Sequence, residues 1–156
     1  TNTKVNPPLR TEADRQALIA GLQDGTIDCI VTDHAPHAPE EKDCEYDYAA
    51  FGISGVETSL PLVWTHLYRA NQLSLSDIVR LMSQRPADIL RLPKGTLQIG
   101  READVLIVDP QVEKAVDVQS FCSKGKNSPY DGMLLYGWAD IVIKSGRIVV
   151  EKGQVK

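Results

Sequence analysis

A short segment of the chain, Asp33-His34-Ala35-Pro36-His37, combines a carboxylic acid with two imidazoles. It directly follows residues 27–32, a mostly apolar run rich in β-branched side chains, which predicts a buried strand. Asp33 would therefore stand where the strand ends and a loop begins. A carboxylate in this place can bind a cation and still exchange a proton. The alternative is that Asp33 only caps the turn that opens at Ala35-Pro36, as aspartates often do.

A second polar loop lies upstream, where Lys4-Val5-Asn6-Pro7-Pro8-Leu9-Arg10 contains two adjacent prolines. Proline fixes the backbone φ angle, so this loop should be stiff. The side-chain amide of Asn6 and the imidazole of His37 can both donate hydrogen bonds. Taken alone, a histidine such as His37 is more commonly a loop residue that is hydrogen-bonded to the backbone.

Residues 1–94 are predicted to form helices around the strand at 27–32. Thr11-Glu12-Ala13-Asp14 has the pattern of a helix N-terminus, and Gly25 is its expected stop. Helix followed by strand is the unit that barrels repeat. The other expected elements are a solvated loop at 38–54, a helix near 56–70, a helix capped by residues 74–77, and a short helix at 86–90 after a break at Arg85-Pro86.

The periodicity changes after Gly95. Residues 97–99 read as a short extended piece, and 104–109 read as a buried strand that Pro110 terminates. Residues 141–143 and 148–150 flank Lys144-Ser145-Gly146-Arg147, which predicts a hairpin with glycine in its turn. We therefore expect residues 95–156 to form a small β unit, distinct from residues 1–94.

Composition limits the classes of function. The 156 residues, 42% of them hydrophobic, suffice for one domain with a core. The net charge is −4, and no basic stripe indicates a nucleic-acid partner. The apolar runs are of strand length and too short to span a bilayer. Cys29, Cys44 and Cys122 form no paired motif, so we expect free thiols in a reducing cytoplasm.

The loops at 4–10 and 33–37 together closely resemble the last active-site loops of dihydroorotases, which are cyclic amidohydrolases. The resemblance implies an α/β fold: the C-terminal part of a (β/α)8 TIM-barrel metal hydrolase at 1–94, and part of a small β-sandwich at 95–156. The chain opens on a functional loop without a preceding strand or an initiator Met, which fits a portion of a longer protein.

The resemblance also implies roles for individual residues. Asp33 would bind the metal and shuttle the proton, while Asn6 and His37 would hold the carboxylate of the substrate. Phe51 and Gly52 would bind the pyrimidine ring through backbone groups, unless they are simply a turn at a helix entry. The substrates implied are L-dihydroorotate and N-carbamoyl-L-aspartate, in pyrimidine biosynthesis. The His34 side chain should point away from the ligand. It would either orient the residues that contact the ligand or support the local structure.

The cofactor implied for the full-length enzyme is a binuclear zinc centre. Of its usual ligands only Asp33 is present, so we expect this chain alone to bind no catalytic zinc and to be inactive. Residues 1–94 should also lack part of a core. Implied partners are further copies of the chain and, as a second candidate, aspartate transcarbamoylase. Two alternatives stay open: a hydantoinase or dihydropyrimidinase of the same fold, and a non-catalytic scaffold for aspartate transcarbamoylase.

Overall fold

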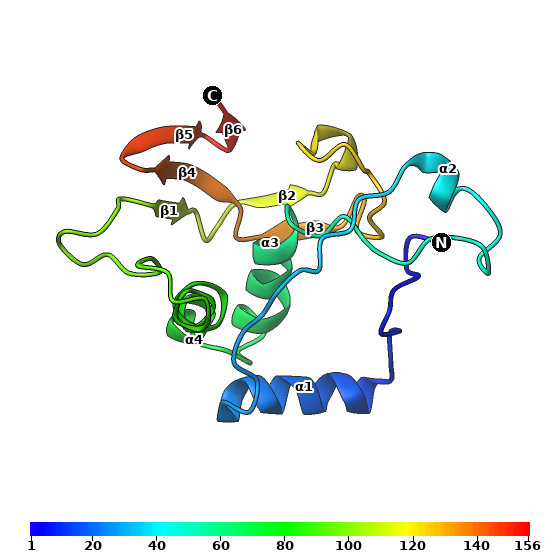
Figure 1. Ribbon diagram of the computed structural model, residues 1–156, viewed down its shortest axis with the longest axis horizontal. Coiled ribbons are helices and arrows are strands. Elements are labelled where there is room, and N and C mark those ends of the chain that lie inside the picture. Colours follow the sequence, from blue (N-terminus) through cyan, green and yellow to red (C-terminus); the bar gives the residue numbers. More distant parts are fainter.

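The computed structural model describes residues 1–156, with the helices gathered in the first part of the chain and the strands in the second (Figure 1). The first part contains α1 (Glu12–Asp24), α2 (Pro39–Lys42), α3 (Ser59–Val63), η1 (Trp64–Tyr68), α4 (Leu75–Val79), η2 (Arg80–Gln84) and α5 (Arg85–Ile89). The second part contains β1 (Val105–Val108), β2 (Glu113–Ala115), η3 (Val118–Ser120), β3 (Leu134–Tyr136), β4 (Ala139–Lys144), β5 (Arg147–Glu151) and β6 (Gln154–Val155).

The first helix, α1, forms where the sequence predicts it. Thr11 and Asp14 make a reciprocal capping box, in which each side chain accepts a hydrogen bond from the backbone N–H of the other. Gly25 ends the helix with φ of 84°, a left-handed conformation that glycine adopts without strain. The predicted helix and both of its ends are confirmed.

The prediction of a strand at residues 27–32 is wrong for this chain. The segment is extended, but no strand lies along either side of it, and strand pairing needs such a neighbour. Its Ile30 N–H instead donates to the carbonyl of Leu81 at 3.0 Å. The nearest ladder contact is a single parallel bridge between His34 and Ile53. Val31 is left 74% exposed.

The predicted break at Arg85-Pro86 is also wrong, because the helical path runs on through α4, η2 and α5. Segment η2 is π-helical, and the N–H of Arg85 bonds to the carbonyl of Arg80, five residues earlier. Pro86 has no N–H to contribute and would clash in a regular α-helix. The wider π-helical turn before it admits the proline without ending the helix.

The structure corrects or refines three smaller expectations. The segment 38–54, predicted to be a loop throughout, contains α2, which has Pro39 in its first turn. The helix predicted near 56–70 begins only at Ser59 and continues from α3 into the π-helical η1. The piece at 97–99 pairs with no strand.

The β unit is built around the predicted hairpin. Strands β1, β4, β5 and β6 form an antiparallel sheet in that order, and β2 pairs with β3 separately. Ser145 and Gly146 turn the chain between β4 and β5 with φ of 50° and 78°, the left-handed geometry of a tight hairpin. This hairpin is confirmed.

Buried apolar side chains form two small clusters. The first joins α1 to the later helices through Leu22, Val63, Leu73, Ile78 and Leu81. The second lies beside β3 and consists of Val116, Val118, Phe121 and Leu135. Many large apolar side chains remain exposed, Leu9 and Leu97 among them. Much of the apolar surface is therefore available for contacts that the chain does not make with itself.

The three cysteines are free thiols, as expected. None of the helices is long and apolar enough to cross a membrane.

Candidate functional site

Four of the five residues proposed for the site line one open pocket of about 260 Å³. These four are Asn6, Asp33, Phe51 and Gly52. The rest of the pocket lining consists of Thr32 and of the apolar or small residues Val5, Pro7, Ala35 and Ile53. The pocket is thus assembled from three loops that lie far apart in the sequence. The structure brings the predicted catalytic carboxylate together with an amide, an aromatic ring and a glycine.

Asp33 has a backbone φ of 43°, in the left-handed region that non-glycine residues rarely occupy. A turn cap would need the carboxylate to accept from a nearby backbone N–H. The N–H of Ala35, two residues on, instead donates to the carbonyl of Ile53 at 2.9 Å. The capping alternative therefore loses its natural donor, and the Asp33 side chain is exposed at the pocket.

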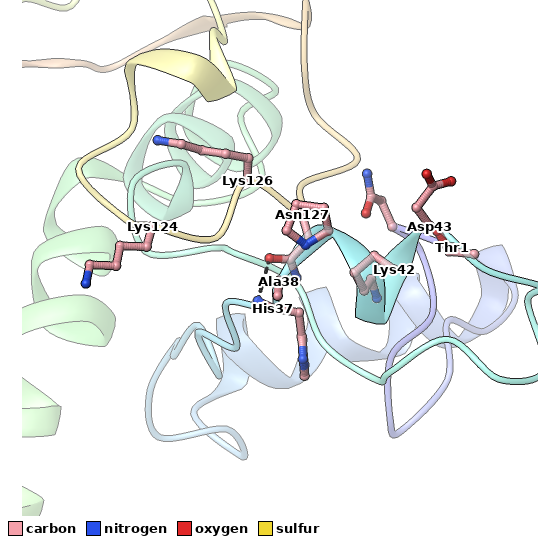
Figure 2. Close-up of a pocket in the computed structure, with 10 residues that line it drawn as sticks. Thr1, His37, Ala38, Lys42, Asp43, Lys124, Lys126 and Asn127 are labelled. Carbon is pink, nitrogen blue, oxygen red and sulfur yellow. Dashed lines mark hydrogen bonds between the residues drawn. The ribbon is translucent and has the colours of Figure 1, made fainter.

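His37 lies beside the other residues but lines a neighbouring pocket of about 280 Å³, which it shares with Lys42 and Asn127 (Figure 2). Its Nε2 atom is 3.0 Å from the carbonyl oxygen of Phe51, and its Nδ1 atom is 3.3 Å from Glu41 Oε2. The backbone N–H of Ala38, and then His37, hold the pKa of Glu41 below its usual value. His37 therefore contacts the segment at Phe51 and Gly52 but does not line the pocket that contains Asn6.

Gly52 occupies a position that no other residue fits. Its φ is 135°, and a Cβ atom there would lie 2.5 Å from Ala35 Cβ and 3.2 Å from His37 Nε2. Its N–H donates to the carbonyl of Lys4 at 2.9 Å, and its carbonyl accepts from the Lys42 ammonium at 3.1 Å. The backbone groups of Gly52 are thus already used within the chain. The helix that follows begins only at Ser59, so Gly52 is not a turn at a helix entry.

His34 lies outside the Asp33 pocket, on the side predicted from strand alternation. Its Nδ1 atom accepts from the backbone N–H groups of Gly55 and Val56, at 3.1 and 3.3 Å. The proton of the neutral ring must then be on Nε2. These bonds connect the segment after Asp33 to the start of the following helical region.

Two buried lysines beside the site were missed by sequence reasoning. Lys4, 7% exposed, donates to the carbonyl of Asp47 at 2.9 Å and lies 4.5 Å from the ring centroid of Phe51. Lys42, 5% exposed, donates to the carbonyls of Ala50 and Gly52. Burial, and then the charge of Lys4, lower the pKa of Lys42. Lysine is almost never fully buried, so no sequence signal could have found them.

Asn127 is a third buried residue beside the site that sequence reasoning missed. The sequence indicates only that residues 124–130 form a structured loop returning to the first part of the chain. In the structure the Asn127 side chain is buried and hydrogen-bonded to both site loops, at 33–37 and 51–54. Nothing local in the sequence marks those contacts, because they join residues that are 73 to 92 positions apart.

The chain by itself does not fit a zinc site. A zinc ion in a protein takes three or four His, Cys, Asp or Glu ligands. No group of three or more such side chains in this chain is placed to hold a metal ion. Asp33 can contribute one ligand, and any others would have to come from outside these 156 residues.

Comparison with known proteins gives consistent results. The model of the amidohydrolase family matches residues 4–149. The chain is 46% identical over 155 residues to a dihydroorotase of Bacillus subtilis (strain 168), and 52% identical over 153 residues to a dihydroorotase of Pelotomaculum thermopropionicum. These alignments take in 99% and 97% of the chain, but 36% and 35% of the relatives. The chain thus spans about a third of the length of these relatives.

Solved structures share the α/β fold. An L-hydantoinase (dihydropyrimidinase) from Arthrobacter aurescens superposes with a TM-score of 0.93 at 37% identity, over 98% of this chain and 35% of that one. A D-hydantoinase (dihydropyrimidinase) from Thermus sp. gives a TM-score of 0.90 at 26% identity, over 99% of this chain and 35% of that one. Since the family model also covers most of the sequence, the chain belongs to the amidohydrolase family.

Proposed function

We propose that the intact protein carrying this chain is a dihydroorotase, which interconverts L-dihydroorotate and N-carbamoyl-L-aspartate in pyrimidine biosynthesis. The observation that carries the proposal is the common pocket of Asp33, Asn6, Phe51 and Gly52. Relatives named dihydroorotase, 46 and 52% identical to the chain, support the same substrate class. In this proposal the chain is the C-terminal part of the enzyme, with barrel elements at 1–94 and sandwich strands at 95–156.

Ring opening adds water to the amide carbon and breaks the carbon–nitrogen bond. The water must lose a proton and the leaving nitrogen must gain one, so a single carboxylate can do both in turn. Asp33 is assigned this role because its side chain is exposed at the pocket and its backbone is held in a strained conformation. The reverse reaction uses the same group in the opposite order.

The remaining residues would bind and orient the substrate. Asn6 would donate from its amide to the substrate carboxylate, and His37 would add its imidazole from the adjoining pocket. Phe51 would offer its backbone N–H to the ring, because Phe51 O and both backbone groups of Gly52 already have partners. The aromatic ring of Phe51 is largely exposed and forms one side of the pocket.

Zinc is the cofactor that we propose for the intact enzyme, with Asp33 as the ligand from this chain. The chain alone offers no complete ligand set, so we expect it to be inactive in isolation. We also propose that the exposed apolar surface is covered by the remaining part of the enzyme and by further copies. Aspartate transcarbamoylase stays a second candidate partner, and the cytoplasm stays the proposed location.

A hydantoinase or dihydropyrimidinase is the second candidate, favoured by the superposition on the Arthrobacter aurescens enzyme. Those substrates lack the ring carboxylate, so they would not need the donors Asn6 and His37. Turnover of dihydroorotate and of an unsubstituted hydantoin by the intact protein separates the two. We expect dihydroorotate to have the higher kcat/KM, and a higher value for the hydantoin would contradict the proposal.

A non-catalytic scaffold would have no use for a pocket that joins Asp33 to Asn6. The same assay tests this alternative as well. Absence of turnover of both substrates by the zinc-loaded intact protein would favour the scaffold.

A further inference from the structure

One buried amide bonds to two of the three loops that form the proposed site, at 33–37 and 51–54. Asn127 lies between η3 and β3 and is 5% exposed. Its Nδ2 atom donates to the carbonyl of Ala35 at 3.0 Å and to the carbonyl of Gly52 at 3.2 Å. Its Oδ1 atom accepts from the backbone N–H of His37 and from the hydroxyl of Ser54, both at 2.9 Å. Both donors and the acceptor of this amide are therefore used within the protein.

The packing around Asn127 leaves little room for movement. A Cβ atom on Gly125 would lie 2.6 Å from Pro36 Cβ and 2.9 Å from Asn127 Oδ1. Ser54, 1% exposed, donates its backbone N–H to the carbonyl of Asn127 at 2.9 Å, and its one hydroxyl proton is shared between Asn127 Oδ1 and the carbonyl of Gly125, which lies 3.0 Å away. The loop that carries Asn127 is thus held against both site loops by backbone and side-chain bonds.

Lys124, Lys126 and Asn127 all line the pocket that contains His37, but Asn127 is the one of the three whose side chain bonds to the site loops. Figure 2 shows Asn127 beside His37 and Ala38, while the side chains of Lys124 and Lys126 extend away from them. Lys126 donates to the carbonyl of Phe121 at 2.7 Å. Among these three side chains, the one that connects the loop to the site is therefore the neutral planar amide of Asn127.

We propose that Asn127 is a positioning residue for substrate binding, which fixes His37 and Gly52 relative to each other. Its planar amide holds the backbone of one loop through Ala35 and His37 and that of the other through Gly52 and Ser54. The inference rests on the proposed function, since it assigns His37 and the Phe51-Gly52 segment to the substrate. Asn127 itself has no free donor for a ligand and acts through these two loops.

The test is a double-mutant cycle in the zinc-loaded intact protein. Asn127→Ala should raise KM for dihydroorotate about tenfold, which corresponds to losing the net free energy of about one hydrogen bond. The substitution should change kcat much less. In the background of His37→Ala the same substitution should raise KM only about twofold, because residues that act together give non-additive effects. Gln119→Ala, an exposed amide of the same part of the chain, is the control and should leave KM unchanged.

A KM for Asn127→Ala equal to that of the wild type, or equal rises in both backgrounds, would overturn the proposal. Amide hydrogen exchange gives a readout that does not depend on the substrate. Asn127→Ala should speed exchange in both loops, 33–37 and 51–54, while Gln119→Ala should not. Unchanged exchange in either loop would refute the positioning role. If the two variants exchange as described but the wild type does not turn over dihydroorotate, the proposed function fails, while the role of Asn127 in fixing the two loops stands.

A second variant serves if Asn127→Ala does not fold. Ser54→Ala removes one hydroxyl that bonds to Asn127 Oδ1 and keeps the amide. It should raise KM about threefold and speed exchange in residues 33–37, which the Ser54 hydroxyl reaches through Asn127. No effect on either measurement would contradict the proposal.

Discussion

The Nε2 atom of His37 lies 3.0 Å from the carbonyl oxygen of Phe51, so the residue expected to bind the substrate carboxylate also contacts the segment expected to bind the ring. On its other side, Nδ1 lies 3.3 Å from the carboxylate of Glu41. Both neighbours are hydrogen-bond acceptors, and a neutral imidazole, which has one N–H, donates to one of them at a time. A single side chain thereby connects two parts of the proposed substrate site.

His37→Ala should weaken the binding of dihydroorotate more than that of a ring substrate without a carboxylate. Losing a hydrogen bond to a charged group costs about 1.5–3 kcal/mol, which corresponds to a KM increase of about one to two powers of ten. The ratio of KM values for dihydroorotate and hydantoin, measured with wild type and variant, checks this. An equal rise for both substrates would mean that His37 does not recognise the carboxylate.

Gly52→Ala should destabilise the protein and reduce its activity. The methyl group would meet Ala35 Cβ at 2.5 Å, and alanine at φ of 135° is strained. We expect a loss of about 1–3 kcal/mol in the free energy of unfolding, measured by denaturant titration. Gly100→Ala is the matched control, because its φ of 87° is also positive but its Cβ would meet no atom within 4 Å. Equal losses in both variants would show that backbone strain alone, and not the close contact, explains the effect.

The sequence predicted those elements whose cause is local. The capping box of Thr11 and the hairpin turn at Ser145-Gly146 each depend on a few adjacent residues, and both form as expected. The strand at 27–32 failed because pairing depends on neighbours that the segment itself does not specify. The predicted break at Pro86 was wrong because the π-helical turn in the preceding residues accommodates the proline.

The candidate site divides in the same way. Asp33 and Asn6 were identified because their loops carry recognisable motifs, and the structure places both at one pocket. Lys4, Lys42 and Asn127 were not identified, because their bonds reach backbone carbonyls of other loops. Such contacts exist only once the chain has folded, and no residue type at those positions predicts them.

An exposed ion-pair cluster should make stability depend on pH. The Lys144 ammonium, and then Lys94, hold the pKa of Asp104 far below its ordinary value of 3.8. A depressed carboxyl pKa stabilises the folded state above the unfolded-state pKa, and this stabilisation is lost as the pH falls through the folded-state value. The difference in Tm between wild type and Asp104→Asn should therefore be present at pH 7 and shrink below pH 4.

Lys94, one of the two lysines that pair with Asp104, makes the stability depend on pH at the alkaline end. Hydrogen bonds to Asp104 and Glu102 raise the pKa of Lys94 above its ordinary value of 10.5, so its contribution to stability is complete below that pH and is lost as the pH rises further.

The control for Asp104→Asn is Asp109→Asn, which removes a carboxylate outside the cluster, directly after the end of β1. A Tm difference for Asp104→Asn that stays constant from pH 7 to pH 3 would contradict the role of these ion pairs.

Zinc titration of the purified 156-residue chain tests the ligand count. With Asp33 as its one ligand near the pocket, the chain should bind no stoichiometric zinc there and show no turnover of dihydroorotate. Anomalous scattering at the zinc edge, with elemental analysis after dialysis, provides the measurement. A fully occupied zinc ion at Asp33 in a monomeric chain would show that the ligand count is wrong.

Asp33→Asn in the intact protein tests the central claim, that Asp33 transfers the proton in amide hydrolysis. Asparagine keeps the size of the side chain but cannot accept and return a proton. Loss of a general acid–base group costs about 10²–10⁴-fold in rate, so kcat for dihydroorotate should fall by that factor while the Tm stays within a few degrees of the wild type. The decisive measurement is kcat of the variant at matched zinc content. A fall of that size supports the role of Asp33, and a kcat within about threefold of the wild type would contradict it.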